Sequence, residues 1–308
     1  MLDLKNLKGM WAGLPIPWDV NGDFDEGTFI ENVSRCIKAG IPAIYTGGST
    51  GEFFACDFEL FKKLTDALLE TVKGTDVLTQ VGIIAQTTEE VIKRGSYAIE
   101  KGADGLQVTF PYWTKLTESE AVSFYRDLNS AFESFPIIHY DIWRNKYRLD
   151  KDILSKISDV YPGLIGVKFT GSDLSKFAEL ASSFPKINFF VGEFLLASAA
   201  PFGAKGCYSS LVYMCPPLML KYFNSCANGM FKEAIGIQKK IAKLMQGIEI
   251  LGIKSIADAP YDKALCAASG FIKGSLSVKK PYESASSYKL EEFRKWVEEN
   301  VPEFLIIK

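Results

Sequence analysis

A lysine lies near the end of a strongly apolar segment, Gly166-Val-Lys-Phe-Thr170, which has the composition of a buried β-strand. A charged ammonium is costly in such surroundings, and desolvation lowers the pKa of a lysine. The unprotonated amine can attack a ketone to form an iminium, an electron sink for cleaving the adjacent carbon bond. Lys168 is therefore a candidate Schiff-base residue, although its strand context alone leaves open that it is an ordinary surface lysine.

A tyrosine closes the apolar segment before it, Pro136-Ile-Ile-His-Tyr140. When two such segments are neighbouring parallel strands, Tyr140 and Lys168 lie at the same rim of the sheet. A phenol there can move protons to and from a carbinolamine or a departing hydroxyl, whereas the alternative is a tyrosine whose ring only packs. The preceding His139 points the other way by strand alternation, toward the helix layer, so we interpret it as structural.

The third candidate is a turn rich in glycine and hydroxyl groups, Tyr45-Thr-Gly-Gly-Ser-Thr-Gly-Glu52. Its backbone N–H groups, with the hydroxyls of Ser49 and Thr50, can hold a carboxylate without a full positive charge. Gly48 belongs to this predicted site because glycine allows the backbone to approach a ligand closely. Glycine and serine are also common in loops for backbone reasons alone, and the lack of a following GK[ST] excludes a P-loop.

The elements that position these residues alternate between apolar strand patterns and amphipathic helix patterns. The candidate strands are residues 11–16, 43–46, 77–83, 105–109, 136–140, 164–169, 187–191 and 206–211, and the helices between them are residues 27–39, 57–72, 88–101, 119–132, 151–158 and 174–182. The spacing of roughly 25 to 35 residues over the first units is that of a βαβ step and predicts an α/β fold, a TIM (β/α)8 barrel.

The barrel is expected over residues 1–225, and a C-terminal helical extension over residues 226–308 packs on it. Three helix patterns fall in this extension, at residues 231–251, 259–270 and 290–300. A Rossmann sheet is not supported, because the first strand-to-helix turn has no GxGxxG.

Composition excludes several classes of function. The 35 basic residues are balanced by 37 acidic ones, so a net charge of −2 provides no field for nucleic acid. The first ten residues have no basic segment followed by an apolar run, and no uncharged apolar stretch reaches about 18 residues, so we expect a cytoplasmic protein without a membrane partner. The six cysteines form no CxxC pair, and a single histidine, His139, cannot build a multi-histidine metal site.

Taken together, the segments Gly47–Glu52 and Gly166–Lys168, with Tyr140, resemble the dihydrodipicolinate synthase and N-acetylneuraminate lyase family of class I aldolases, and the order and spacing of motifs and strands agree over most of the chain. The resemblance implies that Lys168 forms a Schiff base with pyruvate or another 2-oxo acid. It implies Tyr140 as the acid/base group, Ser49 and Thr50 as carboxylate ligands, and Thr50 as a member of the catalytic set. It further implies an aldehyde as second substrate and a homotetramer built as a dimer of dimers. No metal or organic cofactor is expected, because a lysine iminium supplies the electron sink by itself.

Within this family the spelling Gly-Ser-Thr-Gly-Glu and the segment Lys168-Phe-Thr-Gly-Ser-Asp-Leu174 resemble the sialate lyase branch more than the synthase branch. That likeness places Thr170 and Glu193 near the variable part of the substrate. Tyr208, in the eighth candidate strand, and Trp113 complete the set of residues expected to bind substrate.

Two departures from the family pattern matter. Pro111-Tyr112-Trp113 stands where the family usually has Pro-Tyr-Tyr, whose second tyrosine reaches a neighbouring subunit's site as part of a proton relay. An indole cannot relay that proton, and Trp113 followed by the helix pattern of residues 121–127 resembles the hydratase-aldolases that cleave arylidene pyruvates. After Tyr140 the family's Tyr-Asn-x-Pro becomes Tyr140-Asp-Ile-Trp143, and Arg144 is shifted by one position from the synthase's substrate-binding arginine.

The leading prediction is a pyruvate-dependent lyase that cleaves or forms a 4-hydroxy-2-oxo acid. Dihydrodipicolinate synthase, sialate lyase, a 2-keto-3-deoxy sugar acid aldolase or dehydratase, and a hydratase-aldolase remain open on the same site. Four aromatic residues on rim loops favour an apolar pocket, or else they serve loop packing: Phe53, Phe54, Trp113 and Trp143. Two other readings are a non-catalytic 2-oxo acid binding protein, suggested by Trp113, and a phosphate-binding barrel based on Gly203-Ala-Lys-Gly206.

Overall fold

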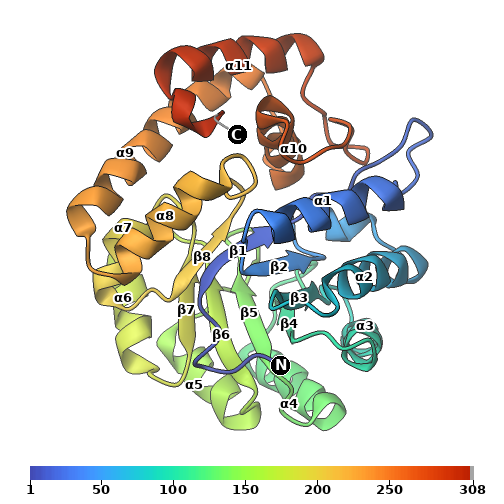
Figure 1. The fold of residues 1–308 in the computed structure, drawn as a ribbon. Coiled ribbons are helices and arrows are strands. Elements are labelled where there is room, and N and C mark those ends of the chain that lie inside the picture. Colours follow the sequence, from blue (N-terminus) through green and yellow to red (C-terminus); the bar gives the residue numbers. More distant parts are fainter. Residues whose placement is uncertain (306–308) are drawn as a thin grey trace. The chain divides into compact units, whose positions relative to one another are not determined.

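The computed structural model describes residues 1–305, in which eight parallel strands follow one another in sequence order and close into a barrel (Figure 1). The strands are β1 (Gly9–Gly13), β2 (Ala43–Thr46), β3 (Leu78–Gly82), β4 (Gly105–Val108), β5 (Ile137–Asp141), β6 (Leu164–Phe169), β7 (Asn188–Val191) and β8 (Gly206–Ser209). Helices separate them along the chain. This strand order confirms the predicted TIM (β/α)8 barrel.

Two compact units make up the chain. The first contains Met1–Gly9 and Leu78–Tyr208, and the second contains Met10–Val77 and Ser209–Lys308. The division into a barrel of residues 1–225 and an extension of residues 226–308 stays a prediction. Its boundary falls within helix α8 (Pro216–Ala227), and residues 306–308 of the extension lie outside the described residues.

The first unit carries β3 to β8 and the helices between them. These are α3 (Thr88–Glu100), α4 (Glu118–Phe132), α5 (Lys151–Val160), α6 (Leu174–Ser183), α7 (Leu196–Ala199) and the 3-10 turn η2 (Ala200–Phe202). The first four begin after a threonine or aspartate whose side chain accepts the backbone N–H three residues on, namely Thr87, Thr117, Asp150 and Asp173. Such caps satisfy an N–H that the helix itself leaves unpaired, so each helix start is fixed locally.

The second unit carries β1, β2 and the C-terminal helices. Its elements are α1 (Glu26–Lys38), η1 (Phe53–Ala55), α2 (Phe58–Val72), α8, α9 (Phe231–Gly247), η3 (Ile248–Leu251), α10 (Asp258–Ser269), α11 (Ser287–Asn300) and η4 (Pro302–Phe304). Helices α9, α10 and α11 are the three predicted after residue 225, and α11 contacts both α9 and α10. Helix α8 was not predicted; it begins with two prolines, which are tolerated in a first helical turn.

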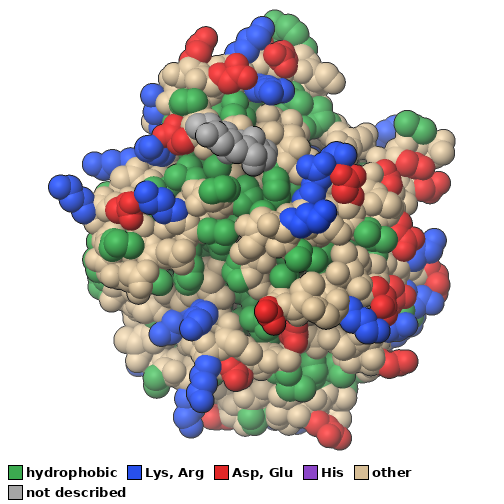
Figure 2. All heavy atoms as spheres, in the orientation of Figure 1, with side chains coloured by type: hydrophobic (Ala, Val, Ile, Leu, Met, Phe, Trp, Pro, Cys, Tyr) green, Lys and Arg blue, Asp and Glu red, His purple; other side chains and the backbone are tan. Residues whose placement is uncertain are grey.

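Charged side chains of both signs are interspersed over the face drawn in Figure 2. This mixture on that face agrees with the near-zero net charge and offers a polyanion no continuous basic area there. Within residues 1–305 no helix is both long enough and apolar enough to cross a membrane. All six cysteines are buried and none forms a disulfide within the described residues, which also contain no cluster of three or more side chains that could hold a metal ion.

Candidate active site

The centre of the first unit is a lysine packed on a tyrosine. Strands β5 and β6 pair in parallel, and this pairing sets Tyr140 directly beside Lys168. The Lys168 Nζ lies 3.9 Å from the centroid of the Tyr140 ring, and the two residues are only 7% and 4% exposed. The structure therefore brings together the two residues to which sequence analysis assigned covalent and acid/base chemistry.

A second tyrosine ring approaches the same amine. The Lys168 Nζ is 4.8 Å from the centroid of the Tyr208 ring, which β8 carries. The Tyr208 hydroxyl donates a hydrogen bond of 2.7 Å to Gln80 Oε1 on β3. Burial raises the pKa of Tyr208 far above its ordinary value, so this residue is a neutral hydrogen-bond donor.

The single histidine lies outside this group. The Nδ1 atom of His139 is 2.6 Å from the Tyr125 hydroxyl, and the imidazole packs 4.7 Å from the ring of Phe110. Burial lowers the pKa of His139 to about 4, with the neighbouring Arg148 adding to the shift and Asp141 opposing it. His139 is thus a neutral side chain packed among aromatic residues of the helix layer, in agreement with its structural interpretation.

The end of β5 is held by an ion pair that sequence analysis did not identify. The buried carboxylate of Asp141 accepts two hydrogen bonds from Arg148, at 2.8 and 2.7 Å, and one from the Leu149 N–H at 3.0 Å. Thr170, which follows β6, donates its hydroxyl to the Asp141 carbonyl oxygen at 2.8 Å. Thr170 therefore ties together the ends of the strands that carry Tyr140 and Lys168. Arg144 instead stacks on the Trp143 ring.

The other two predicted substrate residues of this unit differ in environment. Glu193 is buried after β7, with its Oε2 4.0 Å from the Cys207 sulfur. Trp113 is 78% exposed; its backbone N–H donates to Gln86 Oε1, and its carbonyl oxygen accepts from Lys146. The indole borders a surface groove of about 400 Å³ between the loops that precede α3 and α4.

In the second unit, the predicted carboxylate-binding turn contains a hydrogen bond that constrains it. Gly48 and Thr50 are buried and Ser49 is half-buried. Thr50 Oγ1 donates to Asp262 Oδ2 at 2.6 Å. A hydroxyl has one proton to donate, so in this arrangement the Thr50 oxygen can only accept a further hydrogen bond. The other hydrogen-bond donors of this turn are its backbone N–H groups and the Ser49 hydroxyl.

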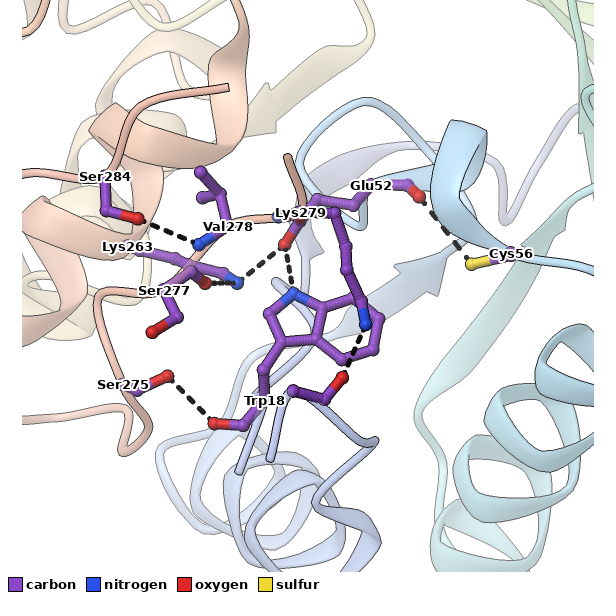
Figure 3. A network of polar contacts seen from close by, with 10 residues as sticks. Trp18, Glu52, Cys56, Lys263, Ser275, Ser277, Val278, Lys279 and Ser284 are labelled. Atoms are coloured by element: carbon purple, nitrogen blue, oxygen red, sulfur yellow. Dashed lines mark hydrogen bonds and ion pairs between the residues drawn. The ribbon is translucent and has the colours of Figure 1, made fainter. Parts of the chain in front are cut away.

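The turn ends at Glu52, which lies at the centre of a buried polar network (Figure 3). Glu52 is 0% exposed and has a left-handed backbone conformation with φ of 45°. Its carboxylate accepts from Trp18 Nε1 at 2.8 Å, Lys263 Nζ at 2.6 Å and the Lys279 N–H at 2.7 Å. These contacts tie the turn to α10 and to the segment that follows it.

Lys263 in this network was missed from the sequence, although a lysine inside the apolar α10 helix is an unusual placement. Burial lowers the pKa of Lys263, against the attraction of Glu52. The Lys263 Nζ also donates to the Ser277 carbonyl oxygen, so the ammonium is partnered on two sides.

Comparison with known proteins agrees with this fold. The sequence pattern of the Dihydrodipicolinate synthetase family matches residues 6–300. An N-acetylneuraminate lyase of Pasteurella multocida is 27% identical over 81% of this chain and 85% of its own length, and a 4-hydroxy-tetrahydrodipicolinate synthase of Phenylobacterium zucineum is 25% identical over 78% and 82%. A prophage protein of the dihydrodipicolinic acid synthase family from E. coli K12, solved in complex with pyruvate, shares the fold with a TM-score of 0.87 at 18% identity, covering 95% of this chain and 98% of that one. The chain belongs to the Dihydrodipicolinate synthetase family, whose members include lyases and synthases of the class I aldolase type.

Proposed function

We propose that this protein is a pyruvate-dependent lyase that cleaves or forms a 4-hydroxy-2-oxo acid through a Schiff base on Lys168. The observation that carries the proposal is the buried Lys168 amine, 3.9 Å from the ring of Tyr140 at the carboxyl ends of two neighbouring strands. In TIM-barrel enzymes this end of the strands carries the chemistry. Pyruvate as the oxo acid is supported by the family and by the complex formed by the E. coli relative.

The proposed reaction starts when the Lys168 amine attacks the carbonyl carbon of the oxo acid to form a carbinolamine. Loss of water gives the iminium, and the electron pair of the bond between carbons 3 and 4 then moves toward the nitrogen. The proton on the 4-hydroxyl leaves as the aldehyde departs, and the remaining enamine takes a proton at carbon 3. Water returns the product and the free amine.

Tyr140 is the proposed acid and base in these steps, because its position beside Lys168 lets one phenol serve both the carbinolamine and the departing hydroxyl. Thr50 is the proposed third catalytic residue. Since its hydroxyl donates to Asp262, we propose that Thr50 acts as a hydrogen-bond acceptor and that Gly48 and Ser49 bind the carboxylate. Thr170, Glu193, Tyr208 and Trp113 are the proposed contacts to the rest of the substrate.

Reductive trapping tests this proposal. Incubation with pyruvate and borohydride is expected to add the mass of one reduced pyruvyl group, and peptide mapping is expected to locate it on Lys168. Lys168→Met should abolish the adduct, whereas Lys101→Met, at the exposed end of α3, should leave it unchanged. An unmodified chain, or an adduct on another lysine, would overturn the proposal. Exchange of the pyruvate methyl protons in deuterated water distinguishes a catalyst from a protein that only binds the oxo acid.

A second candidate within this chemistry is a hydratase-aldolase that acts on aromatic aldehydes. It is favoured by two exposed indoles in the first unit, Trp113 at 78% and Trp143 at 52% exposure. An exposed aromatic surface can stack on an aromatic substrate. A panel of aldehydes tested with pyruvate separates the candidates: Trp113→Ala should lower kcat/KM for aromatic aldehydes and leave aliphatic and sugar aldehydes unchanged. Equal loss with every aldehyde would argue against a stacking role.

The assembly, which the family resemblance suggests, and the location are also proposals. We propose a cytoplasmic homotetramer, and light scattering of the purified protein gives the mass that tests it.

A further inference from the structure

The interior of the first unit contains a buried polar group that its fold does not require. Barrel interiors are normally filled by branched apolar side chains, but β3 contributes Gln80 and β4 contributes Gln107, both 0% exposed. Among the described residues, Gln80 Nε2 and both polar atoms of the Gln107 amide form no hydrogen bond. Burying amides with unsatisfied atoms is unfavourable, so these two glutamines call for an explanation.

The amide oxygen of Gln80 accepts a hydrogen bond and thereby holds Tyr208 in place. Gln80 Oε1 accepts the Tyr208 hydroxyl at 2.7 Å, and the Tyr208 ring meets the ring of Phe190 edge-on at 5.2 Å. Burial raises the pKa of Tyr208, and the nearby Gln107 lowers it by a smaller amount. The hydroxyl and the ring are thus held by different neighbours, which leaves Tyr208 little freedom to turn.

The fixed ring lies against the reacting nitrogen. Lys168 Nζ is 4.8 Å from the Tyr208 centroid and 3.9 Å from the Tyr140 centroid, both within the range of a cation–π contact. The hydroxyl of Tyr208 donates its only proton to Gln80 Oε1. Tyr208 is therefore placed to act through its ring rather than through its hydroxyl.

We propose that Tyr208 stabilises the positive charge on the Lys168 nitrogen, in the ammonium and in the iminium, and that Gln80 is the positioning residue that aims its ring. This inference rests on the proposed Schiff-base function and goes beyond it, since it assigns Tyr208 to the lysine instead of the substrate. An iminium carries a full positive charge in a buried site, where water cannot solvate it, and the electron-rich faces of aromatic rings offset that cost.

The strands beside β6 carry other charged and titratable groups. Tyr140 and Asp141 lie on β5, and Asp141 is paired with Arg148. Glu193 follows β7, and Tyr208 itself is on β8. A test must therefore change the Tyr208 ring while leaving these groups in place.

The test compares Tyr208→Leu with Tyr208→Phe by reductive trapping over a range of pyruvate concentration and pH. At a pH where the free Lys168 amine is unprotonated, iminium formation creates the positive charge. Removing the ring should there raise the pyruvate concentration for half-trapping by about 2- to 30-fold, the factor that corresponds to a cation–π contact. Tyr208→Phe keeps the ring but loses the hydrogen bond to Gln80 Oε1, and Gln80→Leu keeps Tyr208 but removes the same bond. Both variants should therefore fall between wild type and Tyr208→Leu.

The direction of the pH effect separates an electrostatic role from a structural one. The ring favours the ammonium, so Tyr208→Leu should move the rising limb of the trapping profile to lower pH. A variant that only loosened the barrel would let water reach the ammonium and move that limb to higher pH. Tyr208→Met gives a second ring-free side chain in case the leucine variant does not fold.

The inference is overturned if the rising limb of the Tyr208→Leu profile stays in place or moves to higher pH. It is also overturned if Tyr208→Phe and Tyr208→Leu are impaired equally. The wild-type protein distinguishes failure of this inference from failure of the proposed function. If wild-type Lys168 forms the adduct and the ring-free variants behave like wild type, only the role of Tyr208 is wrong. If the wild-type protein forms no adduct, the Schiff base itself is wrong.

Discussion

The hydroxyl of Thr50 donates its only proton to the carboxylate of Asp262, 2.6 Å away, and both side chains are buried. The contact joins the motif turn after β2 to helix α10, which lies 212 residues farther along the chain. With this proton donated, the Thr50 oxygen can only accept a hydrogen bond from any other group. The motif turn is thus oriented by a residue outside the motif.

This contact predicts a coupling between Thr50 and Asp262. Thr50→Val and Asp262→Ala should each destabilise the fold by about 1 to 3 kcal/mol, because each leaves a buried polar group without its partner. The double variant should lose less than the sum, by about 1 kcal/mol or more. Urea unfolding of the four proteins measures this cycle; strict additivity would show that the hydrogen bond contributes nothing specific.

The same pair predicts a difference in activity. If Thr50 acts as an acceptor in the proposed site, Asp262→Asn can reverse the hydrogen bond by offering an amide N–H, and the Thr50 proton then points elsewhere. We expect kcat to fall about tenfold or more while the pyruvate concentration for half-trapping changes little. A change confined to pyruvate affinity would instead assign Thr50 to carboxylate binding.

Replacing the proposed acid/base residue gives a third prediction. Tyr140→Phe keeps the ring beside Lys168 and removes only the hydroxyl, so kcat should fall by about 10² to 10⁴, the usual contribution of general acid–base catalysis. The adduct on Lys168 should still form, more slowly. Tyr97→Phe on α3 is the matched control and should leave kcat unchanged. Full activity of Tyr140→Phe would remove this residue from the mechanism.

The buried ion pair between Glu52 and Lys263 predicts a large effect on stability. Lys263→Met leaves the Glu52 carboxylate buried without its cation, and Glu52→Gln does the reverse, so each should cost about 3 to 5 kcal/mol. The double variant should be more stable than the sum of the two predicts. As a control, the exposed pair of Lys156 and Glu118 should contribute little, and Lys156→Met should unfold close to wild type. Equal effects at the buried and exposed pairs would contradict this account.

The alternation of apolar and amphipathic segments was enough to predict the barrel and the bounds of its most regular strands. The bounds of β2 and β6 coincide with the predicted residues 43–46 and 164–169, because short apolar runs there are bounded by turn residues. At β1 the prediction was displaced: residues 11–16 were expected, but the strand is Gly9–Gly13. Leu14 and Ile16 are buried without belonging to the strand, so burial alone extended the apolar pattern beyond its end.

The sequence predicted which site residues lie close together only where the order of the strands determines their proximity. Tyr140 and Lys168 come from neighbouring strands of a parallel sheet, so their proximity follows from position along each strand. The partners Gln80 and Tyr208 are 128 residues apart, and Glu52 and Lys263 are 211 apart. No local pattern relates residues at such separations. The substrate does not follow from overall similarity either, since a lyase and a synthase match this chain almost equally, at 27% and 25% identity.

The single histidine makes the pH dependence of stability directly testable. Burial lowers the pKa of His139 from 6.5 to about 4 in the folded protein, so between these values the unfolded chain binds more protons. Stability from the neutral imidazole is complete above pH 6.5 and is lost as the pH falls toward 4. Relative to His139→Gln, wild type should lose about 2 kcal/mol of unfolding free energy between pH 7 and pH 5.

The hydrogen bond between His139 and Tyr125 supplies the control. Burial also raises the pKa of Tyr125 well above its ordinary value, so Tyr125 keeps its proton, and the neutral imidazole can bond to its hydroxyl in either tautomer. Tyr125→Phe removes this hydrogen bond but retains the buried imidazole, and should therefore keep the pH dependence that His139→Gln loses. NMR titration of the one imidazole in the protein reads the same quantity without unfolding. A midpoint near 6.5 would mean that water reaches the ring, and the packing described for the helix layer around β5 would then be wrong.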